Sequence, residues 1–201
     1  MQKLLNLPEI NESFEFEKYR SFLLKEYENY VTSISTRAMA VSMKCCCYFL
    51  HLIEKIQPKS VIDFGSGFSS FAIRKYKKIT GNNFEIWSVD SDKKWLKKSK
   101  VFCKNNNVES DNFYEWSNVE ERRFDLIFFD IDKTVKRLDY FAPLFENFCN
   151  GNTVILFDDM HKPILRKQLH YELNNLNKEH TFCNTEQITK EGRRFSHLVQ
   201  I

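Results

Sequence analysis

The sequence contains few of the residues that interrupt a folded chain. Glycine and proline supply 5 and 4 of the 201 residues, so no Gly- or Pro-rich linker separates two domains. No apolar stretch reaches the roughly 18 residues of a membrane-spanning helix, and the first residues lack the basic flank, apolar core and cleavage site of a secretory signal. These absences predict one domain over residues 1–201, located in the cytoplasm and without a membrane partner.

Neither sign of charge is in large excess. Lys and Arg total 30, Asp and Glu total 27, and the formal net charge is +3. The basic residues are also scattered along the chain rather than clustered. Such a balance argues against a protein built to bind nucleic acid or a membrane surface.

The six cysteines suit neither a disulfide framework nor a metal site. Three of them are consecutive, at 45–47, whereas zinc sites use spaced pairs such as C-x-x-C. They fall in a helix-like segment that ends before Pro58, so we expect small buried thiols. The other three, Cys103, Cys149 and Cys183, are too dispersed to form a cluster.

The hydrophobic pattern changes near residue 58. Residues 1–57 show helical spacing and predict an N-terminal helical cap, whereas short β-rich runs alternate with helix-like stretches beyond them. The predicted strands are Ser60–Phe64, Phe84–Val89, Phe124–Phe129 and Thr153–Phe157, and the predicted helices are Ser69–Lys78, Lys93–Asn105, Leu138–Phe148 and Pro163–Asn177. The alternation predicts a parallel sheet covered on both faces, and a turn at Lys190–Arg193 predicts a C-terminal antiparallel hairpin.

Carboxylates stand at the end of every predicted parallel strand. Asp63 lies near the end of the first, Asp90 and Asp130 follow the next two, and Asp158 and Asp159 follow the last. In open α/β sheets, ligands bind beyond the carboxyl ends of the strands. We therefore expect these acids to meet at one edge of the sheet.

The segment SVIDFGSGFSSF, residues 60–71, places two of the five glycines in one turn, where the backbone can approach a ligand closely. A dinucleotide-binding turn has a third glycine where this chain has Ser70, and the charge of Asp63 would repel a pyrophosphate. An acid here suits a cationic ligand instead, and S-adenosylmethionine carries an ammonium group and a sulfonium. Asp90 stands 25 residues after Gly65, a suitable place for a carboxylate that accepts from ribose hydroxyls.

Four segments together resemble the class I S-adenosylmethionine-dependent methyltransferases. They are VIDFGSGFSSFAI, IWSVDSDKKWL, FDLIFFDIDK and GNTVILFDDMHK, within about residues 58–165. The resemblance implies a doubly wound, Rossmann-like α/β sheet of seven strands, mostly parallel with a C-terminal antiparallel hairpin, in which residues 58–201 form the cofactor-binding core. One departure is Ser69, where the family usually has a third glycine.

The resemblance also implies which residues bind S-adenosylmethionine. Gly65 and Gly67 would line its methionine part, and Asp63 would reach the ammonium group directly or through water. Asp90 would bind the ribose, and the two residues at 116–117 would flank the adenine. The complete predicted set is Asp63, Gly65, Ser66, Gly67, Ser69, Asp90, Ser91, Trp116, Ser117 and Asp130.

Acids after the last two parallel strands resemble the metal site of the catechol-type O-methyltransferases. That pattern is D-x-x-K followed by D-N or D-D, matched here by Asp130, Lys133, Asp158 and Asp159. The resemblance implies that the three aspartates hold Mg²⁺, with Lys133 as the base that takes the proton of a substrate hydroxyl. The predicted catalytic residues are Lys133, Asp130 and His161, the histidine being the competing base.

A metal-independent branch with a DD-x-x-R/K pattern is the alternative. Three close carboxylates repel one another, so without a metal ion Lys133 or Arg137 would have to compensate their charge. Arg137 has two other readings, a contact to an anionic substrate or a place on a solvated helix face.

The sequence thus predicts methyl transfer from S-adenosylmethionine to a small-molecule acceptor, at an oxygen and with help from a metal. The alternatives are a metal-independent methyltransferase for a nitrogen or sugar acceptor, a cofactor-binding protein without transferase activity, and a dinucleotide-dependent oxidoreductase. We expect no nucleic-acid partner. The oligomeric state is left open, with a homodimer as one option.

Overall fold

The computed structural model describes residues 6–176 and 179–201. Three helices come first, α1 (Leu7–Glu12), α2 (Phe16–Ser33) and α3 (Met43–Ile56). The strands are β1 (Ser60–Phe64), β2 (Glu85–Asp90), β3 (Phe113–Glu115), β4 (Phe124–Phe129), β5 (Cys149–Phe157), β6 (Thr181–Asn184) and β7 (His197–Gln200). The helices between them are α4 (Phe68–Thr80), α5 (Lys93–Asn105), α6 (Thr134–Arg137), α7 (Phe141–Pro143), α8 (Pro163–Asn175) and α9 (Glu186–Thr189), with 3₁₀ turns at Trp116–Asn118 and Leu138–Tyr140 and a π-helical turn at Leu144–Phe148.

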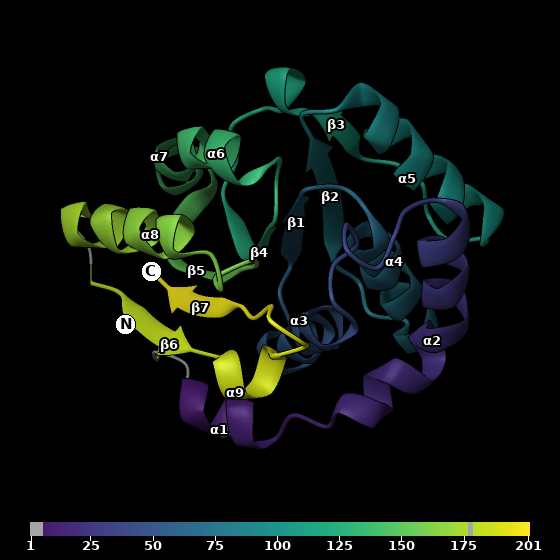
Figure 1. Cartoon of the computed structure of the whole chain (residues 1–201), viewed down its shortest axis with the longest axis horizontal. Coiled ribbons are helices and arrows are strands. Elements are labelled where there is room, and N and C mark those ends of the chain that lie inside the picture. Colours follow the sequence, from purple (N-terminus) through teal and green to yellow (C-terminus); the bar gives the residue numbers. More distant parts are fainter. Residues whose placement is uncertain (1–5, 177–178) are drawn as a thin grey trace.

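The strands form one seven-stranded sheet in the order β3-β2-β1-β4-β5-β7-β6 (Figure 1). Strands β1 to β5 run parallel, whereas β7 pairs antiparallel with both β5 and β6. The predicted fold class is therefore confirmed. Because the strand order reverses between β1 and β4, the loops that follow these strands diverge and leave room for a ligand at the carboxyl edge.

Two predicted elements differ in detail from the structure. The connection between β6 and β7 is longer than a tight turn, because it contains α9 before the turn closed by a bridge between Glu191 and Arg194. Buried hydroxyls hold α9 there, since Thr185 donates to the Ser196 carbonyl at 2.6 Å. The single helix predicted over Leu138–Phe148 is a series of short α, 3₁₀ and π turns, and its Pro143 has no N–H for a regular helix.

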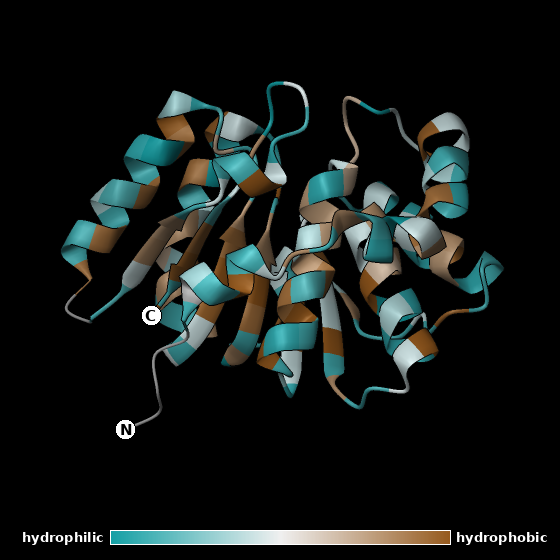
Figure 2. Ribbon diagram, turned by 90° about the horizontal axis from the view of Figure 1, so that it is seen from below, coloured by the Kyte–Doolittle hydropathy of each residue, from teal (hydrophilic) through white to brown (hydrophobic). Residues whose placement is uncertain are grey.

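The sheet is covered on both faces by apolar side chains. On one face the N-terminal α3 packs against β4, where the rings of Phe49 and Phe128 lie 5.1 Å apart. On the other face Phe129 of β4 lies 5.1 Å from Phe141 of α7. Figure 2 shows hydrophobic residues along the central strands and hydrophilic ones on the outer helix surfaces. Residues 1–57 thus supply part of one core layer, as far as they are described.

The three adjacent cysteines lie on α3, as the sequence predicts. All three are free and buried, and burial raises the pKa of each thiol. Cys45 Sγ lies 2.9 Å from Ser196 Oγ, so α3 contacts the segment that leads into β7.

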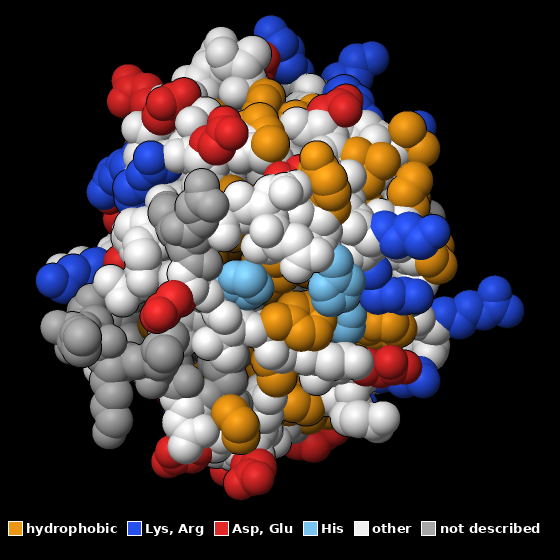
Figure 3. All heavy atoms as spheres, turned by 90° about the vertical axis from the view of Figure 1, so that its left-hand side faces the viewer, with side chains coloured by type: hydrophobic (Ala, Val, Ile, Leu, Met, Phe, Trp, Pro, Cys, Tyr) orange, Lys and Arg blue, Asp and Glu red, His pale blue; other side chains and the backbone are white. Residues whose placement is uncertain are grey.

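The outer edge of the sheet at β6 lies beside α8. Phe182 of β6 is 36% exposed and Tyr171 of α8 is 63% exposed. Figure 3 shows this side of the molecule, where apolar and histidine side chains lie in the middle and Lys and Arg side chains around the margins, most of them on the right. Within residues 6–176 and 179–201, none of the helices combines the length and apolar character needed to cross a membrane.

Candidate active site

A cleft of about 440 Å³ opens at the carboxyl edge of the sheet. Its walls include the loops after β1, β2, β4 and β5, as the strand order predicts. The N-terminal part of the chain contributes Tyr30 of α2 and the loop at 38–41. Arg194 lines the cleft too, and it donates to the carbonyl of Ala40 at 2.7 Å and to that of Arg37 at 2.9 Å. The cleft therefore lies between the N-terminal cap and the loops of the sheet.

The glycine turn after β1 brings two loops together. Gly65 adopts a φ of +103°, and a Cβ at this position would lie 2.4 Å from the carbonyl oxygen of Asp130. Any side chain here would push the loops after β1 and β4 apart, so glycine is required. Gly67 has an extended backbone, and a Cβ there would lie 3.4 Å from the Tyr30 hydroxyl and 3.8 Å from Trp95 Nε1. Residue 67 thus faces other side chains of the cleft.

Asp63 supports this turn from below. Its side chain is fully buried and accepts hydrogen bonds from Ser69, at 3.0 Å, and from Ser70. Burial raises the pKa of Asp63 to about 7, although both serine hydroxyls oppose the shift. Asp63 does not line the cleft. The carboxylate shapes the turn, and its contact with an ammonium group, directly or through water, remains a prediction.

Asp90 is the carboxylate that the cleft presents at the end of β2. It is 6% exposed, and it accepts from the Ser66 hydroxyl at 2.9 Å and from the Asp92 N–H at 2.9 Å. Burial raises its pKa. A carboxylate offers about four acceptor positions, more than these partners occupy, which leaves capacity for hydroxyls of a ligand. The neighbouring Ser91 also lines the cleft and donates to Asp132 at 2.6 Å.

The structure does not bring Trp116 and Ser117 to the wall of this cleft. The Trp116 ring packs 4.6 Å from Tyr140 and 5.4 Å from Phe64, on the face of the sheet that α7 covers. Their contact with adenine remains a prediction.

A buried arginine pairs with two of the three acids after β4 and β5. The Arg137 side chain is 4% exposed, with one guanidinium nitrogen 2.6 Å from Asp130 and another 3.5 Å from Asp159. It also donates to the carbonyls of Ile131 at 2.8 Å and Asp132 at 2.9 Å, which fix its orientation. Lys162 adds a second cation, 2.5 Å from Asp159. The reading of Arg137 as a solvated residue is therefore wrong, because α6 turns its side chain back under the loop.

The environment acts differently on the three carboxylates. Burial raises the pKa of Asp130 and of Asp158, while Arg137 acts in the opposite sense on both. For Asp159, burial also acts upward, but Lys162 and Arg137 outweigh it and lower the pKa. Asp158 accepts from the Ser196 hydroxyl at 3.0 Å and from the Asp159 N–H at 2.7 Å.

These partners do not fit the predicted Mg²⁺ site. Each of the three carboxylates is already engaged by a guanidinium, an ammonium, a hydroxyl or an N–H. Mg²⁺ prefers oxygen ligands and retains several waters, whereas the Arg137 guanidinium carries its own positive charge into the centre of the cluster. Nor does any group of three His, Cys, Asp or Glu within the described ranges have an arrangement that could hold a metal ion.

Two candidate proton acceptors line the cleft. Lys133 is exposed at the start of α6. His161 follows β5 and is partly buried, with Nδ1 3.7 Å from Asp159. Burial lowers the pKa of His161, although Asp159 opposes the shift, so the imidazole is neutral near pH 7 and can accept a proton.

Sequence reasoning missed some side chains that shape the site. Tyr30, residues 38–41 and Arg194 line the cleft from parts of the chain with no recognisable motif. Their place depends on how the cap packs on the sheet. Arg137 was not missed: its role as a cation that compensates the clustered acids, predicted from the sequence as the alternative to a metal ion, is confirmed by its ion pairs with Asp130 and Asp159.

The sequence matches no protein-family model and no curated protein, but solved structures resemble the fold. The SAH-bound methyltransferase PaMTH1 of Podospora anserina has a TM-score of 0.65 at 16% identity, over 99% of this chain and 97% of its own. The O-methyltransferase TomG of Streptomyces achromogenes, in complex with SAM, has a TM-score of 0.63 at 12% identity, over 98% of this chain and 99% of its own. The tRNA (m1A58) methyltransferase TrmI of Aquifex aeolicus has a TM-score of 0.56 at 14% identity, over 81% of this chain and 70% of its own. The chain thus has a Rossmann-like methyltransferase fold, which occurs with acceptors of different kinds.

Replacing Arg137 with Met should destabilise the protein by about 3–5 kcal/mol, because the buried carboxylates lose their compensating charge. The loss of unfolding free energy caused by Arg137→Met should be larger at higher pH. An aspartate whose pKa is higher in the folded than in the unfolded protein contributes stability at low pH, below its unfolded pKa of about 3.9. That stability is lost as the pH rises through the folded pKa. Removing Arg137 raises the folded pKa further, so more stability is lost at high pH. Urea unfolding at pH 5 and pH 8 measures both effects.

Lys136→Met is the matched control. Lys136 lies on the same short helix and pairs with Asp132 at 2.6 Å, but its side chain is 58% exposed. Its loss should change stability by less than about 1 kcal/mol. Equal effects of the two variants, or an Arg137→Met effect independent of pH, would contradict the role assigned to the buried guanidinium.

Proposed function

We propose that this protein transfers the methyl group of S-adenosylmethionine to an oxygen atom of a small molecule, without a metal ion. The observation that carries the proposal is the cleft itself, where the glycine turn after β1 and the acceptor carboxylate of Asp90 face one space. S-adenosylmethionine supplies an electrophilic methyl group on a sulfonium. The likeness in fold to SAM- and SAH-bound methyltransferases supports the same ligand.

The residues of the cleft fit this ligand. The close approach of the Gly65 turn to the loop after β4 excludes a side chain at residue 65, so the backbone of this residue lies at the wall of the cleft. Asp90 would accept the two ribose hydroxyls with its remaining acceptor positions, and Gly67 would face the methionine part. Ser66 and Ser69 would hold the turn, the first by donating to Asp90 and the second by donating to Asp63.

For the acceptor, His161 is our candidate for the proton-accepting residue. It stands after β5 on the wall of the cleft, and its neutral imidazole can take the proton of a hydroxyl as that oxygen attacks the methyl group. Asp159, 3.7 Å from Nδ1, would stabilise the resulting imidazolium. Asp130 is held by Arg137 at 2.6 Å, which suits it to fixing the loop after β4 rather than to accepting the proton.

Titration with S-adenosylhomocysteine and with NAD in a calorimeter tests the ligand. We expect binding of the first and none of the second. Asp90→Asn should weaken S-adenosylhomocysteine binding about tenfold, because a charged acceptor of two hydroxyls becomes a neutral amide. Asp139→Asn, an exposed position outside the cleft, is the matched control. A folded protein that binds NAD in preference, or an Asp90→Asn variant with unchanged affinity, would overturn the assignment.

Turnover separates the two candidate bases. With the best acceptor from a screen of hydroxylated small molecules, His161→Gln should lower kcat about a hundredfold and leave S-adenosylhomocysteine affinity unchanged. Activity of the wild type should persist into mildly acidic solution, since burial lowers the pKa of His161. If His161→Gln keeps full turnover while Lys133→Met is inactive, the lysine is the base instead. If no acceptor is methylated although the cofactor binds, the protein is a cofactor-binding protein without transferase activity.

A further inference from the structure

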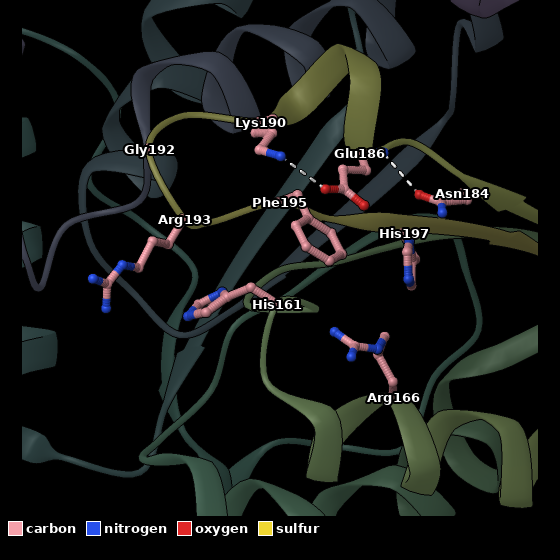
Figure 4. Close-up of a pocket in the computed structure, with 9 residues that line it drawn as sticks. All are labelled: His161, Arg166, Asn184, Glu186, Lys190, Gly192, Arg193, Phe195 and His197. Atoms are coloured by element: carbon pink, nitrogen blue, oxygen red, sulfur yellow. Dashed lines mark hydrogen bonds and ion pairs between the residues drawn. The ribbon is translucent and has the colours of Figure 1, made fainter.

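A second cavity adjoins the cleft at the same edge of the sheet. It measures about 620 Å³ and is lined by side chains from the loop after β5, from α8, and from the segment that joins β6 to β7. The last residue of β6 and the first residue of β7 are paired at this edge, as Asn184 and His197. Figure 4 shows Phe195 and His197 pointing toward the side of the pocket on which Arg166 lies, with the His161 ring and the outward-pointing side chain of Arg193 at the opposite end. We call this cavity the basic pocket.

The positive charge of the basic pocket is only partly compensated. Lys190 pairs with Glu186 at 3.0 Å. Arg166 donates to the carbonyl of Met160 at 2.5 Å and lies 5.8 Å from the Phe195 ring. Among the residues that the structure describes, no carboxylate lies within ion-pair distance of Arg166 or Arg193. The basic pocket is therefore lined by two permanently charged arginines, Arg166 inside it and Arg193 at its rim, that have no carboxylate partner among the described residues.

Among the described residues, one ring nitrogen of a buried histidine in the pocket wall has no hydrogen-bond partner. His197 is 3% exposed, and its Nδ1 has no partner among the described residues. Its ring lies between Phe182 and Phe195, at centroid distances of 5.1 Å and 5.4 Å. A buried polar atom without a partner is unfavourable, because it has lost its hydrogen bonds to water. A ligand oxygen in the pocket would supply that partner.

His161 connects the basic pocket with the cleft. It is the residue that lines both cavities, and its own Nδ1 is buried without a hydrogen bond. A molecule with one end in the basic pocket can therefore place its other end beside His161, at the wall of the cleft. Arg166 and Arg193 would hold the first end, and His161 would meet the second.

We propose that the basic pocket binds a carboxylate or phosphate group of the methyl acceptor, so that the acceptor is an anionic small molecule whose hydroxyl lies beside His161. Arginine suits this role because its planar guanidinium can donate two parallel hydrogen bonds to either group. This inference rests on the function proposed above and adds the chemical class of the acceptor. The aromatic side chain of Phe195 gives the pocket an apolar wall for the carbon skeleton between the two ends.

Inorganic phosphate and acetate are the probes for the pocket. Each is titrated into the full chain in the presence of saturating S-adenosylhomocysteine, in low-salt buffer. The double variant Arg166→Met, Arg193→Met should bind the anions about tenfold more weakly than the wild type. The matched control is Lys167→Met with Lys100→Met, which removes the same charge from exposed positions outside both cavities and should leave binding unchanged.

The single variant Arg193→Met keeps the test valid if Arg166→Met fails to fold, because Arg193 is exposed and Arg166 holds the Met160 carbonyl. Equal anion affinity in the arginine and lysine variants, or no binding of either anion, overturns the inference. If S-adenosylhomocysteine still binds in that case, the proposed function stands. Absence of S-adenosylhomocysteine binding by the folded wild type overturns the proposed function instead. In a turnover screen, hydroxy acids should be methylated faster than their neutral amides, and the opposite order would also contradict the inference.

Discussion

Three aspartates share the carboxyl edge of β4 and β5, and they can do so because the Arg137 guanidinium is buried among them. Because the carboxyl ends of parallel strands lie at the same edge of the sheet, the topology itself brings these three carboxylates together, where their negative charges repel one another. Arg137 meets it with ion pairs to two of the carboxylates and with hydrogen bonds to the carbonyls of the loop that carries the first. The same loop approaches Gly65 so closely that a Cβ would collide with its backbone. The guanidinium thus helps to set the position of the wall against which the glycine turn rests.

This arrangement separates the two chemical tasks of the site. On one side, the Gly65 turn and Asp90 present backbone and an acceptor carboxylate suited to the neutral and cationic parts of S-adenosylmethionine. On the other, His161 stands between the cleft and a pocket with two unpaired guanidinium groups. Because fixed cations already pair with two of the three acids, the proposed transfer would require positioning and one proton acceptor rather than a metal ion. Arg137 and Lys162 place two positive charges beside these acids.

The sequence predicts the sheet well, since continuous apolar runs bounded by acids and glycines mark β1 and β4 at the bounds observed. It also predicts the edge at which ligands bind, because the topology of parallel strands decides that. It predicts side-chain geometry poorly. Whether Asp63 faces a ligand or lies beneath the turn depends on two serine hydroxyls, and whether Arg137 faces solvent depends on the direction of a four-residue helix. Contacts from the cap, such as Tyr30, follow from packing between segments with no shared motif.

Calorimetric titration of the wild-type protein with Mg²⁺ tests the central claim most directly, because it needs neither cofactor nor acceptor. We expect no binding to the cluster of Asp130, Asp158 and Asp159, since the Arg137 guanidinium already occupies it. Binding of Mg²⁺ by the wild type that is abolished by Asp158→Asn would contradict the account and return the site to metal-assisted chemistry.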